Sequence, residues 1–167
     1  WIGTEDGGLN RFNLNTKEFS FFAPSAGFTN IHGLCLVDDK LWVGTFSKGL
    51  KIIDTRTGTV LKTYQKNSSP RSLIDNSIFA ICRTATGDIY LGTMFGLVKY
   101  NKQSVDFDRI PELNGKFVYD IKEDSGGNIW LATYANGAYC YNVNDRKWKN
   151  YVHDEKDTTS LSYNKVS

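Results

Sequence analysis

One phrase recurs four times along this chain: an aromatic residue, an apolar residue, Gly or Ala, and then Thr. Its aromatic positions are Trp1, Trp42, Tyr90 and Trp130, which are 41, 48 and 40 residues apart. A period near 40 residues is typical of repeat proteins, and it suits either helical repeats or the blades of a β-propeller. The choice between the two depends on whether each unit is made of helices or strands.

Each unit reads as strands. It opens with a β-rich run (30–37, 77–84 and 116–123), continues through a tight turn to the aromatic phrase, and enters a third strand at a glycine. A polar turn then leads to a fourth strand, and no segment shows a sustained 3.6-residue apolar period. Four short antiparallel strands in each unit are typical of a propeller blade. We therefore predict an all-β fold in which residues 1–167 form one propeller fragment of four repeats of four antiparallel strands, almost without helix, as an open arc or as part of a larger propeller.

The repeated aromatic, Thr and Gly residues are expected to pack each blade against its neighbour. The chain opens in the second strand of a blade, and residues 160–166 match residues 72–78, which lead into a first strand. We therefore expect the chain to be a piece of a longer array and its last residues to begin another blade.

Charge and cysteine usage exclude several functions. The formal net charge is only +2, with no basic run of the kind that binds nucleic acid or anionic membranes. No apolar run reaches the ~18 residues of a membrane span. The three cysteines, at 35, 82 and 140, are too few and scattered for a zinc site, and we expect them to be small buried side chains. His32 and His153 lack partners at ligand spacing. We predict no metal, no cofactor and no catalytic residue.

The repeated phrase resembles the two-component regulator propeller repeat, here "DSGGNIWLATYANGAYCYN" and "TGDIYLGTMFGLVKYN". The resemblance covers essentially the whole chain, with small departures such as Ala132 in place of the usual Gly. It implies the periplasmic sensor region of a hybrid histidine kinase from Bacteroidetes, anchored in the inner membrane by parts of the parent chain outside these residues. It also implies an oligosaccharide ligand, regulation of polysaccharide utilisation, signalling as a dimer, and no enzymatic activity in these 167 residues.

Strand direction locates the expected binding face. In an antiparallel meander, the loops after strands two and four share one end, and those loops vary between the units of this chain. Variable loops on a constant scaffold are typical of a binding surface. Their aromatic residues are able to stack on sugar rings, and their polar residues are able to bond hydroxyl groups. The candidate ligand-binding residues are Glu5, Asp6, Phe46, Lys48, Arg71, Phe95, Tyr134 and Asn136.

Two other functions remain open at this point. A propeller enzyme acting on glycans needs two carboxylates that converge on one face, and no motif in the chain supports such a pair. A scaffold for protein interactions is the other alternative, although the Gly-His and Trp-Asp marks of that repeat class are missing. An open arc leaves strand edges exposed, so we expect this fragment to form dimers or larger assemblies.

Overall fold

The computed structural model describes residues 1–22 and 30–167. Within these residues the chain forms one three-stranded and three four-stranded sheets, all antiparallel, and a single turn of 3-10 helix, η2 (Pro111–Leu113). No helix in this part of the chain is long and apolar enough to cross a membrane. The prediction of an all-β fold almost without helix is therefore confirmed.

The sheets follow one another along the chain as four blades. Blade 1 comprises β1 (Ile2–Thr4), β2 (Gly8–Phe12) and β3 (Phe19–Phe22). Blade 2 comprises β4 (Ile31–Val37), β5 (Lys40–Thr45), β6 (Leu50–Asp54) and β7 (Val60–Tyr64). Blade 3 comprises β8 (Ile78–Arg83), β9 (Ile89–Thr93), β10 (Gly96–Asn101) and β11 (Asp106–Arg109). Blade 4 comprises β12 (Val118–Glu123), β13 (Ile129–Thr133), β14 (Ala138–Asn142) and β15 (Lys147–Tyr151).

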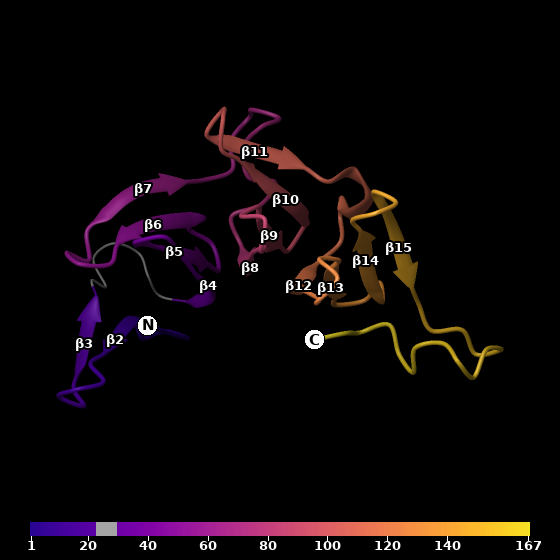
Figure 1. The fold of residues 1–167 in the computed structure, drawn as a ribbon, viewed down its shortest axis with the longest axis horizontal. Helices are drawn as coiled ribbons and strands as arrows, with labels where there is room; N and C mark the ends of the chain where they lie inside the picture. The colour runs from indigo at the N-terminus through magenta and orange to yellow at the C-terminus, as the bar shows by residue number, and fades with distance from the viewer. Residues whose placement is uncertain (23–29) are drawn as a thin grey trace.

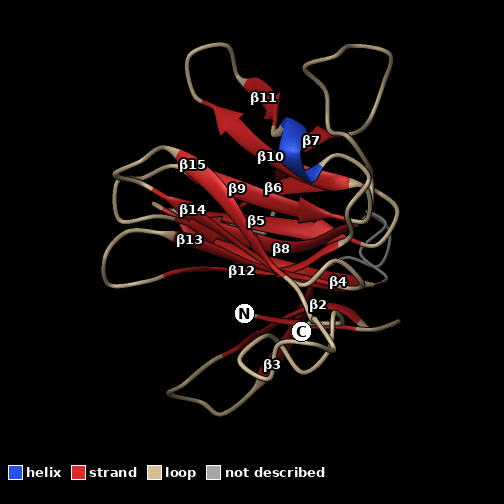
Figure 2. Ribbon diagram, turned by 90° about the vertical axis from the view of Figure 1, so that its right-hand side faces the viewer, coloured by secondary structure: helices blue, strands red, loops and turns tan. Residues whose placement is uncertain are grey.

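The blades are arranged as an open arc (Figure 1). Strands β4, β8 and β12 lie on its inner side, and β7, β11 and β15 lie on its outer side. In each four-stranded blade the spatial order equals the chain order, so each blade is a simple meander. The loops therefore gather at the two ends of the strands, as Figure 2 shows from the side.

The apolar core lies between the blades. Three clusters of buried residues fill the seams, one for each neighbouring pair. Leu41 and Val43 of blade 2 meet Leu9 of blade 1, Trp42 lies in the cluster of Ile89 and Leu91 of blade 3, and Tyr90 in that of Leu131 of blade 4. Both faces of β5 and β9 are thus buried, which is why these strands do not alternate between apolar and polar residues.

The Gly of the repeated phrase lets the next blade approach closely. A Cβ atom on Gly44 would lie 2.6 Å from the Ile78 Cγ2 atom, at the start of the first strand of blade 3. Gly3 and Gly92 face Ile31 and Val118 of the following blades in the same way. The expected role of this glycine in packing a blade on its neighbour is therefore confirmed.

The end of the chain repeats contacts seen earlier. The Asn76 carbonyl accepts a hydrogen bond from the Gly49 amide at 3.0 Å, and its Oδ1 atom accepts one from the Lys66 amide at 2.7 Å. Asn164 accepts the same two bonds from the amides of Gly137 and His153, at 2.8 and 2.7 Å. The predicted match between residues 160–166 and 72–78 thus holds in three dimensions. Residues 153–164 thus leave blade 4 in the same way as residues 66–76 leave blade 2 before β8.

Candidate functional site

The loops after second and fourth strands lie at one edge of the arc, which we call the loop edge. The register places them together, because Thr45 at the end of β5 pairs with Ile31 at the start of β4, and Leu50 at the start of β6 pairs with Tyr64 at the end of β7. Its described loops are 5–7, 46–49, 94–95 and 134–137 after second strands, and 65–77, 110–117 and 152–165 after fourth strands. The loop expected at 25–30 lies mostly outside the described residues.

A threonine–glycine hydrogen bond braces each loop that follows a second strand. The Thr hydroxyl donates to the carbonyl of the glycine that opens the third strand. The distances are 3.0 Å for Thr4–Gly8, 2.8 Å for Thr45–Gly49, 2.9 Å for Thr93–Gly96 and 2.5 Å for Thr133–Gly137. This bond lies within one blade, and the expectation that the Thr packs on the neighbouring blade stays a prediction. The brace fixes both ends of the loop and leaves the residues between them free to vary.

The predicted residues in these loops are exposed or half-buried. Glu5, Asp6 and Lys48 are exposed, and Asn136 is half-buried. Two of them also shape their loops: the Asp6 amide donates to the Asn30 Oδ1 atom at 2.7 Å, and the Asn136 amide donates to the Thr133 hydroxyl at 3.0 Å. Their side chains face solvent at the loop edge.

The three predicted aromatic residues differ in their surroundings. Phe95 is 52% exposed, and Phe46 and Tyr134 are 41% and 46% exposed. The Tyr134 ring stacks on Phe117 with centroids 5.5 Å apart, and the Lys165 Nζ atom lies 4.5 Å from its centroid. Phe46 lies 6.1 Å from both His32 and Phe79. Phe46 and Tyr134 thus belong to a larger aromatic group, whereas Phe95 lies in the loop between β9 and β10.

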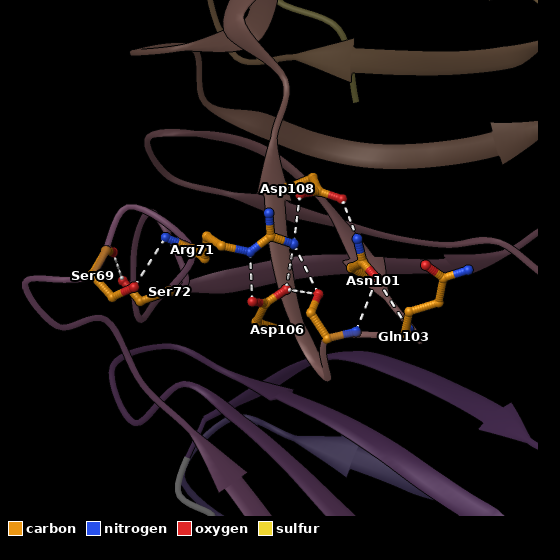
Figure 3. A network of polar contacts seen from close by, with 8 residues as sticks. Ser69, Arg71, Ser72, Asn101, Gln103, Asp106 and Asp108 are labelled. Atoms are coloured by element: carbon orange, nitrogen blue, oxygen red, sulfur yellow. Dashed lines mark hydrogen bonds and ion pairs between the residues drawn. The ribbon is translucent and has the colours of Figure 1, made fainter.

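Arg71 makes a contact between blades (Figure 3). Its Nε atom lies 2.6 Å from the Asp106 Oδ2 atom, and its Nη2 atom lies 3.1 Å from the Asp108 Oδ1 atom. Nη2 also donates to the Ser104 hydroxyl at 2.8 Å. The hydrogen bonds that the Asp106 carboxylate accepts from Arg71 and from the Ser104 hydroxyl lower its pKa to about 2. Arg71 therefore ties the loop after β7 to β11 in the outer part of blade 3, and its contact with a ligand stays a prediction.

An aromatic group missed by the sequence analysis lies on the inner strands. The residue after the first buried position of each first strand is His32 in β4, Phe79 in β8 and Tyr119 in β12. The His32 and Phe79 rings stack with centroids 4.8 Å apart, and the Phe79 and Tyr119 rings stack at 6.0 Å. Phe117 lies 4.4 Å from Phe79. Alignment of the repeats on Ile31, Ile78 and Val118 is the signal that would have identified these positions.

The same position lines a cavity at the centre of the arc. The cavity has a volume of about 260 Å³, and its lining residues are His32, Phe79, Tyr119, Asp120 and Ser167. Ser167 follows Val166, which matches Ile78, so it is the fourth copy of the position held by the three rings. The site therefore combines an aromatic centre with variable, mostly polar loops at the same edge.

Comparisons with known proteins agree with this architecture. The family model described as "Two component regulator propeller" matches residues 72–95 and 112–135. A curated relative, Histidine kinase P4 of Formosa agariphila, is 32% identical over 145 residues, which are 80% of this chain. The chain spans only 11% of that relative's length.

Solved structures share the fold. The extracellular domain of a proposed hybrid two-component system from B. thetaiotaomicron matches 96% of this chain and 27% of its own length, with a TM-score of 0.66 and 21% identity. PorZ of Porphyromonas gingivalis, a surface component of the type-IX secretion system, matches 98% of this chain and 26% of its own length, with a TM-score of 0.73 and 15% identity. At these identities the two likenesses establish the propeller fold.

Proposed function

Because this chain belongs to the family of two-component regulator propeller repeats, we propose that it is part of the periplasmic sensor region of a hybrid two-component histidine kinase. We also propose that it binds an oligosaccharide. The repeat family and the kinase relative support the sensor role. In this proposal the parent chain supplies the membrane span, the kinase and the response regulator, and the propeller supplies recognition.

The observation that carries the proposal is the composition of the loop edge. At this edge, exposed aromatic rings of blades 2, 3 and 4 lie beside variable polar loops. The C–H faces of a pyranose pack well on aromatic rings, and its hydroxyl groups bond to carboxylates, amides and ammonium groups. A surface that offers both kinds of contact suits an uncharged polymer of sugar rings better than an apolar peptide or a lipid.

Binding and signalling are separable in this proposal. We assign recognition to this segment and leave catalysis to other parts of the parent chain. Signal transfer would then depend on a change in the arrangement of two parent chains, in line with the dimer predicted from the sequence.

The test is calorimetric titration of the complete parent ectodomain with a panel of oligosaccharides derived from plant, algal and host polysaccharides. We expect saturable binding of one class, and phosphorylation of the full-length parent in membrane vesicles that responds to that class alone. Turnover of the bound glycan would favour the propeller enzyme. A complete lack of glycan binding would overturn the proposal.

A further inference from the structure

A β-bulge recurs at one position in the first strand of blades 2, 3 and 4. The register between first and second strands shifts between Ile31 and Gly33, between Ile78 and Ala80, and between Val118 and Asp120. The residue inside each shift is His32, Phe79 or Tyr119. A bulge redirects a side chain relative to the regular alternation of a strand, and bulges are frequent beside functional sites.

These bulges turn aromatic rings toward the inside of the arc. Tyr119 is 43% exposed, His32 is exposed and Phe79 is half-buried, whereas Ile31, Ile78 and Val118 just before them are buried. The three rings form one stack through Phe79. The rings at three successive bulges therefore form a continuous, partly exposed aromatic surface on the inner strands.

The charge of the cavity restricts what it accepts. Asp120 is the charged residue of the lining, and no Lys or Arg belongs to the lining in the described part of the chain. The Asp120 carboxylate accepts one hydrogen bond from the Ile121 amide at 2.8 Å and pairs with the Lys122 Nζ atom at 3.0 Å. A ligand with its own carboxylate or sulfate would lie near this carboxylate, and the Lys122 ammonium group is already paired with Asp120 and lies outside the lining.

We propose that this central cavity binds one ring of a neutral sugar, stacked against the aromatic side chains at the bulges, with Asp120, Ser167 and His32 bonded to its hydroxyl groups. The inference rests on the proposed function and deepens it, because it assigns the primary contact to the inner strands and the ligand to the uncharged class. The volume of about 260 Å³ lies just under the ~300–1,000 Å³ usual for small-molecule pockets, which suits a single sugar ring rather than a longer stretch of chain.

The experiment compares variants of the complete parent ectodomain with the oligosaccharide that the wild type binds. Tyr119→Ser introduces the residue that the repeat itself carries at Ser167, and we expect about tenfold weaker binding from the loss of one aromatic contact. Phe21→Ser is the matched control, because Phe21 is 76% exposed on the outer strand of blade 1, and its affinity should equal that of the wild type. Equal thermal midpoints and circular dichroism spectra confirm that both variants fold.

Two further measurements test stacking and charge. Proton NMR of the bound sugar should show upfield shifts of its C–H protons in the wild type, which disappear in Tyr119→Ser. Neutral oligosaccharides should bind more tightly than matched uronic acid or sulfated ones, and Asp120→Asn should reduce that difference.

The outcomes separate the two proposals. Unchanged affinity in Tyr119→Ser, or a larger loss in Phe95→Ser at a loop tip, overturns the central site and leaves the oligosaccharide sensor standing. Preference for an anionic glycan overturns the neutral class. Absence of any glycan binding to the wild-type ectodomain overturns the proposed function, and this inference with it.

Discussion

Blades 2 and 4 carry the same tryptophan in the same phrase, yet their surroundings differ. Trp42 is 6% exposed and packs edge-on against Tyr100 of blade 3, with ring centroids 4.9 Å apart. Trp130 is 37% exposed and stacks on Tyr151 of its own blade at 5.6 Å. The blade that follows therefore buries the repeated aromatic residue. How far this residue is buried depends on its contact with the next blade rather than on its own blade.

The comparison extends to the small residue of the phrase. Gly44 contacts the first strand of blade 3 so closely that a methyl group would overlap Ile78. Ala132 holds the equivalent position in blade 4, where it lines, together with Val166, a cavity of about 180 Å³. The seam between blades 2 and 3 thus leaves no room for a larger side chain at Gly44, whereas the partly covered face of blade 4 accommodates Ala132.

The largest expected difference is between the two tryptophans. Trp42→Ala removes a buried ring and should lower the free energy of unfolding by about 3–5 kcal/mol. Trp130→Ala loses one stacking contact and one hydrogen bond, and should cost about 1–2 kcal/mol. Urea denaturation of both variants measures the difference. Equal losses would mean that the following blade contributes little to the burial of Trp42.

The second largest effect is expected when a methyl group is added at Gly44, in the seam between blades 2 and 3. Gly44→Ala places a Cβ atom 2.6 Å from the Ile78 Cγ2 atom and 3.2 Å from the Ile78 carbonyl oxygen, and should cost about 1–3 kcal/mol because the backbone of blade 3 must shift. The reciprocal change Ala132→Gly serves as the control, with an expected cost of about 0.5–1 kcal/mol from backbone entropy alone. A stable Gly44→Ala protein would show that the seam is loose.

The ion pair of Arg71 with Asp106, which we call the outer clamp, should make the stability of the fold depend on pH. The Arg71 guanidinium beside Asp106 lowers the pKa of that carboxyl to about 2, below the ~3.9 of an unfolded chain. The clamp therefore stabilises the fold above about pH 4, and its contribution is lost as the pH falls through about 2. Arg71→Gln should lower the urea midpoint at pH 7 and leave little difference near pH 2. A difference of the same size at pH 7 and at pH 2 would contradict a contribution through the Asp106 carboxylate.

The smallest effect concerns how Trp130 is held. Its Nε1 atom donates to the Asp124 Oδ2 atom at 2.9 Å, and this bond, with those from Asn128 and Gly126, lowers the pKa of Asp124 to about 2. Trp130→Phe removes the donor and should raise that pKa toward its usual value, as measured by NMR titration of the Asp124 side chain. An unchanged pKa would mean that the hairpin amides alone hold the carboxylate, and that Trp130 is fixed by stacking.

The repeat period and strand content predicted the blades because each strand of this fold is short, local and bounded by its own turn. The position of the loop edge followed from strand parity alone. The sequence analysis missed the ring stack because a β-bulge breaks the two-residue alternation at His32, Phe79 and Tyr119, and a bulge depends on pairing with the next strand. The bond from Thr45 to Gly49 was not predicted for a related reason, since a buried hydroxyl can bond within its blade or across a seam and the residue type does not distinguish the two.

The contacts that Asn76 and Asn164 share have a consequence for how such arrays change in length. The connecting segments after blades 2 and 4 are each fastened to the blade before them by the same pair of hydrogen bonds, to amides of that blade and of the segment itself. In these two cases a blade and its connector therefore form a module that carries its own attachment. Duplication or loss of such a module leaves the attachment of the other intact, so evolution is able to lengthen or shorten the array by whole blades, while the rings at the bulges and the residues at the loop tips diverge independently.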